Sequence, residues 1–205
     1  MRNAGAVCVF FLLIATSIDA AITQFKWTDC ASSDPNRALQ IQEITATPMP
    51  LVTPGPLVLH IKGKIAKDLT KWSLKLDIRR HTFAGSVLIP CTHDFGSCTF
   101  DGCKVLSEMT NQQNQGISTL ANQVQKMLTQ NNIDITCPVK SQPVSVDTFT
   151  ITVPELGAVA DVLADGDYTV DVRALNPDSG ELFGCITFDA AIKRKCTGWL
   201  CHRKR

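Results

Sequence analysis

Three neighbouring residues have the chemical types needed for nucleophilic catalysis. Cys91, His93 and Asp94 could supply a thiol nucleophile, its general base and an orienting carboxylate. Such a nucleophile reacts as a free thiolate. Cys98 follows Cys91 after a short turn, and that loop can close as a disulfide because Gly96 lets the backbone fold back at little steric cost. We therefore expect a disulfide loop here and a protein that is not an enzyme.

The first twenty residues have the pattern of a secretory signal peptide. Arg2 precedes an apolar run from Ala4 to Ile14, and small residues follow and end at Ala20. We expect cleavage after Ala20, with Ala15–Ser17 as the alternative site. Cleavage at either site removes Cys8 and leaves eight of the nine cysteines. An even number of cysteines in an exported chain favours disulfides over metal or thiol chemistry, and their pairing cannot be deduced from sequence alone.

The last thirteen residues, 193–205, form a basic tail with six Lys or Arg residues. Without this tail and the signal peptide, 13 basic residues remain against 18 acidic ones. Such an acidic body lacks the broad basic face that nucleic acid requires, so we expect no nucleic-acid partner. The tail favours contact with an anionic membrane surface, at about 1 kcal/mol per basic residue. A solvated tail and its removal by proteases are the alternatives.

The tail also contains residues that could bind zinc, namely Cys196, Cys201 and His202. In an exported chain a disulfide between Cys196 and Cys201, closing a small loop around Trp199 and Leu200, is favoured over zinc. We expect no metal ion and no cofactor.

Apolar and polar residues alternate through most of the chain, which is the period of a strand with one buried face. The alternating runs are 57–65, 72–78, 149–153 and 168–174, and Phe183–Ile192 is a more apolar strand. Prolines and glycines lie between these runs. Short strands separated by turns predict an all-β protein, an immunoglobulin-like β-sandwich or β-cup.

One stretch departs from this alternation. No proline occurs between Ser107 and Asn132, and apolar residues recur there at spacings of three and four. We expect one short amphipathic helix over about 117–130 within a long loop. The helix could form a wall or lid of a cavity, or it could pack on the outside of the sheets, and both arrangements bury the same residues. These residues are Ile117, Leu120, Val124, Met127 and Leu128.

Six segments, in order along the chain, resemble landmarks of the MD-2-related lipid-recognition (ML) family, and of its sphingolipid activators in particular. The resemblance spans roughly residues 25–192, and we expect an ML-type domain over residues 21–192, after the signal peptide 1–20. The segments are Phe25–Cys30, Thr53–Gly55, Ile89–Leu106, Val153–Leu156, Gly166–Tyr168 and Leu182–Ile186.

The resemblance implies a cup between two splayed sheets that holds a lipid, with its headgroup near the mouth. An acyl chain that leaves a bilayer loses about 0.8 kcal/mol for each methylene, which a cavity can replace and a shallow patch cannot. The resemblance also implies disulfides Cys30–Cys185, Cys91–Cys98 and Cys103–Cys137, the last of which ties the helix-bearing loop, and leaves Cys196 and Cys201 to pair with each other.

Positions near the expected mouth and interior supply the remaining candidate lipid-binding residues. Besides the five helix residues, they are Phe83, Val87, Leu88, Phe95, Phe100, Leu106, Leu156, Val159, Val162, Leu163 and Tyr168.

With the resemblance, these expectations describe a secreted, non-enzymatic lipid-binding and transfer protein that extracts a glycosphingolipid or phospholipid from membranes and carries or presents it. Its partners would be the lipid, a transiently contacted membrane surface and, if the activator role applies, a glycosidase. A sterol or fatty-acid carrier, or an innate-immune lipid-recognition module of the same fold, is one alternative. A secreted lipid hydrolase is the alternative of another class. The sequence has no N-x-S/T sequon, which favours an extracellular location over the lysosome.

Overall fold

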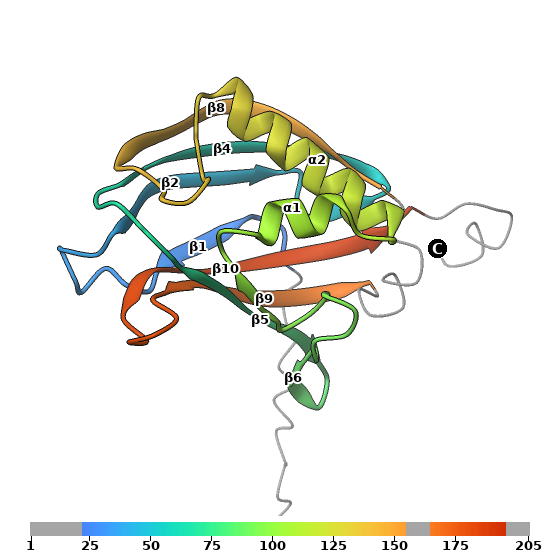
Figure 1. Ribbon diagram of the computed structural model, residues 1–205. Coiled ribbons are helices and arrows are strands. Elements are labelled where there is room, and N and C mark those ends of the chain that lie inside the picture. The colour runs from blue at the N-terminus through green and yellow to red at the C-terminus, as the bar shows by residue number, and fades with distance from the viewer. Residues whose placement is uncertain (1–21, 155–164, 196–205) are drawn as a thin grey trace, which may run out of the picture.

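Alternating residues form the strands of two sheets in the computed structural model, which describes residues 22–154 and 165–195. The sheets lie face to face (Figure 1), and the prediction of an all-β sandwich is confirmed. The larger sheet has the order β1 (Lys26–Asp29), β10 (Leu182–Arg194), β9 (Gly166–Leu175), β5 (Ser73–Thr82) and β6 (Gly85–Leu88), with β3 (Leu51–Thr53) paired to β10 and β7 (Thr99–Asp101) to β5. The smaller sheet consists of β2 (Leu39–Thr47), β4 (Gly55–Ile65) and β8 (Gln142–Val153).

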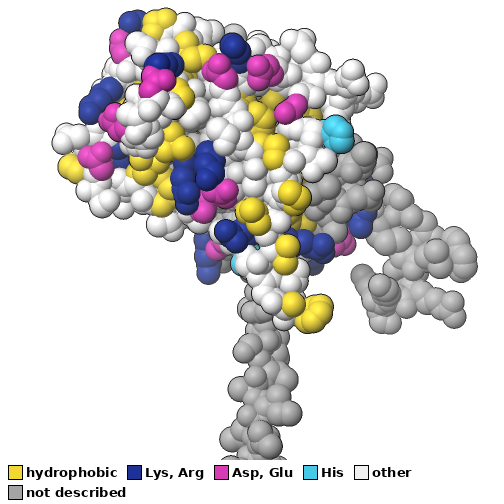
Figure 2. All heavy atoms as spheres, turned by 60° about the horizontal axis from the view of Figure 1, so that its bottom comes forward, with side chains coloured by type: hydrophobic (Ala, Val, Ile, Leu, Met, Phe, Trp, Pro, Cys, Tyr) yellow, Lys and Arg dark blue, Asp and Glu magenta, His cyan; other side chains and the backbone are white. Residues whose placement is uncertain are grey.

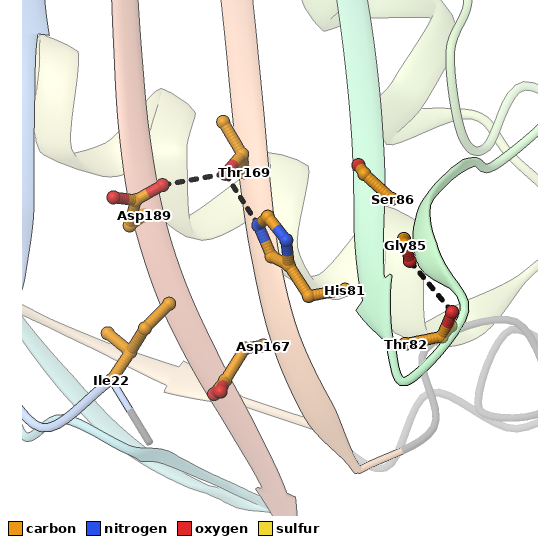
Figure 3. A pocket seen from close by; sticks show the side chains of 8 residues that line it. All are labelled: Ile22, His81, Thr82, Gly85, Ser86, Asp167, Thr169 and Asp189. Carbon is orange, nitrogen blue, oxygen red and sulfur yellow. Dashed lines mark hydrogen bonds between the residues drawn. The ribbon is translucent and has the colours of Figure 1, made fainter. Parts of the chain in front are cut away.

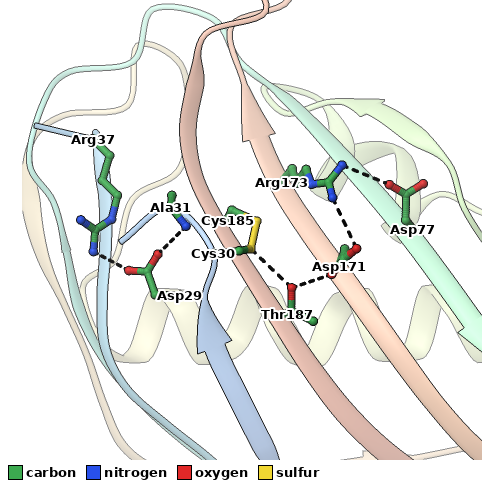
Figure 4. Close-up of a disulfide and its surroundings, with 9 residues drawn as sticks. All are labelled: Asp29, Cys30, Ala31, Arg37, Asp77, Asp171, Arg173, Cys185 and Thr187. Carbon is green, nitrogen blue, oxygen red and sulfur yellow. Dashed lines mark hydrogen bonds and ion pairs between the residues drawn. A yellow bond between two sulfur atoms is a disulfide. The ribbon is translucent and has the colours of Figure 1, made fainter. Parts of the chain in front are cut away.

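The two faces of the larger sheet differ because successive side chains of a strand point to opposite sides. On the outer face, the Thr187 hydroxyl donates to Asp171 Oδ1 at 2.5 Å, and Arg173 lies 3.4 Å from Asp171 and 3.6 Å from Asp77 (Figure 4). The intervening residues, such as Val170 and Ile186, face the smaller sheet and line the space between the sheets.

The sheets meet closely at one end of the sandwich. A Cβ atom at Gly184 of β10 would lie 2.6 Å from the Leu39 Cβ of β2, so only glycine permits this approach. The disulfide between Cys30 and Cys185 lies beside this contact (Figure 4). Toward the other end of β10, the facing side chains do not fill the space between the sheets.

Three disulfides are present in the described part of the chain, and they are the pairs that the resemblance implied: Cys30–Cys185, Cys91–Cys98 and Cys103–Cys137. Cys196 and Cys201 lie outside the described residues.

The connection between β7 and β8 contains two helices, one more than we expected. These are α1 (Val105–Thr110) and α2 (Gln115–Gln130), and Cys103–Cys137 ties the two ends of the connection. Helix α2 starts two residues before the predicted boundary because the Asn114 side chain caps it, accepting from the backbone of Gly116 and Ile117 at 2.9 and 3.3 Å. No helix among residues 22–154 and 165–195 is long and apolar enough to cross a membrane.

Helix α2 covers β8, the edge strand of the smaller sheet (Figure 1). The Gln123 side chain donates to the Thr152 carbonyl at 2.9 Å and accepts from the Thr152 amide at 2.7 Å. These bonds satisfy backbone groups that an edge strand otherwise leaves unpaired. The helix is therefore fixed to the sheet by directional contacts as well as by its apolar face.

Candidate functional site

A cavity of about 420 Å³ lies between the two sheets, within the range of roughly 300–1,000 Å³ typical of small-molecule sites. Its walls come from inward positions of both sheets and from the segments that join them. The lining residues are Ile44, Ala46, Leu57, Leu59 and Ile61 from the smaller sheet, Leu51, Ile78, Tyr168, Val170, Ile186, Phe188, Ala190 and Ile192 from the larger sheet, and Phe25, Met49 and Phe95 from connecting segments.

A second compartment of about 220 Å³ continues toward the closed end of the sandwich. Ile186 lines both compartments, and Ile41 and Val172 line the second one. From Ile186 to Ile192, β10 extends over about 20 Å at roughly 3.3 Å per residue. The space between the sheets is therefore elongated along the strands, as an extended hydrocarbon chain requires.

Tyr168 lines the larger compartment, whose surface is apolar. The residue is 1% exposed, and this burial raises the pKa of its hydroxyl above the ordinary value. Arg80, Asp165 and Arg194 lie close enough to influence the same pKa electrostatically. The phenol is consequently uncharged at neutral pH, and the other lining side chains are hydrocarbon or thioether.

Phe95, a predicted lipid-binding residue, is held against the cavity by the Cys91–Cys98 loop. The Thr92 amide donates to the Phe95 carbonyl at 2.7 Å, and the Phe95 amide donates back to the Thr92 carbonyl at 3.1 Å. Gly96 has φ = 103°, and a Cβ there would lie 2.2 Å from the carbonyl oxygen of Pro90. The loop therefore positions one aromatic ring and depends on glycine to do so.

The catalytic alternative lacks its nucleophile, because the Cys91 sulfur is bonded to Cys98. Asp94 accepts instead from the Gln112 side chain at 2.7 Å. Among the described residues, no group of His, Cys, Asp and Glu side chains has the arrangement of a metal site.

The remaining predicted residues occupy three other settings. Phe83, Val87 and Leu88 are exposed on the β5–β6 hairpin. Phe100 packs with Cys98 and Val105 in a separate core cluster, and Leu106 is half-buried. The positions Leu156, Val159, Val162 and Leu163 lie outside the described residues.

The helix residues pack beside the cavity wall, at the β8 edge of the smaller sheet. Met127 is buried with Ile133 and Val146, and Val124 and Leu128 pack on that cluster. Leu59 and Ile61 pack on the same cluster and also line the cavity. Ile61 pairs with Val146, so these side chains share the inward face of the smaller sheet. Helix α2 therefore closes the side of the sandwich at its edge strand β8. Ile117 and Leu120 are half-buried.

Sequence reasoning missed most residues that line the cavity. Leu57, Leu59 and Ile61 belong to a predicted alternating run, and Val170 belongs to another. Their alternation identified the buried face, but we assigned the lipid to connecting segments and the helix. Both runs place their apolar residues on the inward face of a sheet, and this shared orientation could have identified them as lining residues.

A second pocket, of about 370 Å³, lies on the outer face of the larger sheet (Figure 3). The Thr169 hydroxyl donates to Asp189 Oδ1 at 2.7 Å and accepts from His81 Nε2 at 2.8 Å, since an ionised carboxylate can only accept. Activation of a hydroxyl nucleophile needs the opposite direction, with the imidazole accepting the proton. This network therefore joins three strands without preparing a nucleophile.

Comparison with known proteins matches the chain to one family. The family model of the ML domain matches residues 24–192. The chain is 27% identical over 172 residues to the ganglioside GM2 activator of Mus musculus, covering 82% of each chain. It is 27% identical over 199 residues to that of Macaca fascicularis, covering 94% of this chain and 97% of the relative. The solved structure of chicken MD-1 complexed with lipid IVa matches at 14% identity and a TM-score of 0.41, covering 80% of this chain and 86% of that one.

Proposed function

The chain belongs to the ML domain family, and we propose that it is a non-enzymatic lipid-binding and transfer protein. The observation that carries this proposal is the elongated cavity of about 420 Å³ between the sheets, whose surface is apolar. Both relatives are ganglioside GM2 activators and match at least 82% of the chain. These relatives favour a glycosphingolipid or phospholipid cargo over a sterol or fatty acid.

The cavity can supply the free energy that a lipid loses when it leaves a bilayer. Each buried methylene is worth about 0.8 kcal/mol, so about ten methylenes recover roughly 8 kcal/mol. The surface that lines the cavity makes only apolar contacts with such a chain. Extraction therefore needs no covalent step, and the cargo leaves unchanged.

The β5–β6 hairpin is suited to transient membrane contact. Phe83 at its turn is fully exposed (105%), and Val87 and Leu88 are 55% and 44% exposed. Hydrophobic side chains gather on this projecting part of the molecule, with Lys and Arg side chains nearby (Figure 2). Apolar groups beside basic ones suit an anionic bilayer surface, where each basic residue contributes about 1 kcal/mol.

We also propose an extracellular location and a glycosidase partner. The signal-peptide pattern and the disulfides support an extracellular protein. The resemblance to sphingolipid activators supports a glycosidase that acts on the presented headgroup. Reconstitution of such an enzyme with its lipid substrate in vesicles, with and without this protein, tests that step separately from lipid binding.

Native mass spectrometry of the secreted, non-reduced protein tests the cavity function, because it detects a bound lipid and identifies it after denaturation. Ala46→Phe fills the cavity, since Ala46 lines it and is 5% exposed. Thr45→Phe adds the same ring at the neighbouring, exposed position of β2 and serves as the matched control. We expect lipid on the wild type and on Thr45→Phe and little on Ala46→Phe. Equal loading of the two variants would contradict the proposal.

A further inference from the structure

Arg80 places a charge on the apolar inner face of β5. It follows Ile78, which lines the cavity, by two residues and pairs in register with Tyr168 of β9, so its side chain belongs to the inward face. Its Nη2 atom donates to the Asp165 carbonyl at 2.9 Å. Its Nε atom is buried and has no hydrogen-bond partner among the described residues. A buried guanidinium donor without a partner is costly, so an acceptor that reaches this atom would be favourable.

Arg194 occupies the corresponding inward position of β10, two residues after Ile192, which lines the cavity. Its amide donates to Asp165 Oδ1 at 2.8 Å, and its Nε lies 3.4 Å from the same oxygen. Ile192 pairs with Gly166, where a Cβ would lie 3.2 Å from the Arg80 Nε. Both arginines therefore lie beyond the lining residues at the same end of the cavity, next to Asp165 and Gly166.

The charges at this end do not cancel. Asp165 is the acidic partner of Arg194, and their side chains are 59% and 52% exposed. A pair so exposed to solvent is weak and exchanges readily with a stronger acceptor. The hydrogen bond that the Arg80 side chain makes within residues 22–154 and 165–195 goes to the neutral carbonyl of Asp165. One positive charge is therefore left near Tyr168, at one end of the apolar cavity.

We propose that Arg80 and Arg194 form a headgroup site that selects a lipid with an oxyanion group, a phosphate, sulfate or carboxylate, next to its hydrocarbon chain. This inference rests on the proposed function, because the chain in the cavity brings the oxyanion to the arginines. A guanidinium binds such groups through two parallel N–H donors, and these charge-assisted bonds are about twice as strong as neutral ones. A lipid with an uncharged headgroup offers Arg80 only neutral acceptors, which bind a guanidinium more weakly. The cavity accepts the hydrocarbon, and the arginines discriminate among headgroups.

A competition experiment tests this selection. The wild type is incubated with equal amounts of phosphatidylglycerol and diacylglycerol that carry identical acyl chains, both in micelles of an uncharged detergent. Native mass spectrometry then gives the ratio of the two bound lipids. We expect about tenfold enrichment of phosphatidylglycerol in the wild type and a ratio near one in Arg80→Gln.

Arg79→Gln is the matched control. It removes the same charge from the adjacent position of β5, but its side chain is exposed and points away from the cavity. We expect it to retain the wild-type ratio. Arg194→Gln provides a second variant that the fold tolerates, because this side chain is about half exposed, and we expect it to lower the ratio severalfold.

The outcomes separate this inference from the proposed function. Retention of both lipids without preference, or an equal loss of preference in Arg79→Gln and Arg80→Gln, would overturn the headgroup site and leave the cavity function intact. Retention of neither lipid by the folded wild type would overturn both.

Discussion

Replacement of Phe83 by serine tests whether the β5–β6 hairpin touches the membrane. The side chain is fully exposed (105%), so the whole ring is available for insertion. Transfer of a phenylalanine side chain from water to an apolar medium is worth about 1.5–3 kcal/mol, or roughly 10- to 100-fold in an equilibrium constant. We expect Phe83→Ser to weaken binding to vesicles of phosphatidylcholine and phosphatidylserine by about tenfold, the low end, because a ring at the interface is only partly buried.

Co-sedimentation with these vesicles measures the effect, and Phe83→Leu is the control because it keeps an apolar side chain at the turn. A fully exposed side chain contributes little to packing, so the free energy of unfolding should change by less than about 0.5 kcal/mol in either variant. Equal vesicle binding by Phe83→Ser and the wild type, with folding intact, would refute membrane contact through this turn. Equally weak binding by Phe83→Leu would show that apolar character is not what matters there.

Two further predictions concern the connection between β7 and β8 and the buried Tyr168. Replacing Cys103 and Cys137 together by serine should loosen the connection that carries α2. Lipid loss in a transfer assay should then increase more than the β-sheet circular dichroism changes. Unchanged lipid retention would argue against a role for this connection. Burial raises the pKa of Tyr168 in the folded protein, so the unfolded chain loses the phenol proton more readily. The free energy of unfolding should therefore fall as the pH rises above about 10, the ordinary tyrosine pKa. Tyr168→Phe should remove that part of the slope in unfolding experiments, and an identical slope in the two proteins would contradict the assigned burial.

Strand β2 shows why part of the fold could not be predicted from alternation. Leu39 and Ile41 line the smaller compartment, and Ile44 and Ala46 line the larger one. All four face inward, although the step from Ile41 to Ile44 is three residues. A register shift between Ile41 and Glu43 inserts the extra residue. A bulge of this kind restores the inward face in space while it breaks the two-residue period in the sequence.

The cavity itself was harder to predict than the strands around it. Alternation shows that Leu59 and Val170 point inward, but it does not show whether facing side chains meet or leave a space. That depends on the separation of the sheets, which is small at Leu39 and Gly184 and larger toward Ile192. Likewise, Arg194 reads as part of a basic run in the sequence, and only the extension of β10 to this residue places it beside the cavity. The disulfide pairs were implied by the family resemblance and not by the spacing of the cysteines.

The open interior leaves the core of this domain incomplete. Side chains around a space of about 420 Å³ lack packing partners that an ordinary core supplies. Each disulfide typically contributes about 2–4 kcal/mol of stability, and three are present in the described residues. A bound lipid fills the same volume and stabilises only the folded state. The empty protein should therefore depend on its disulfides much more than the lipid-loaded protein does, because cross-links and cargo compensate for the same missing core.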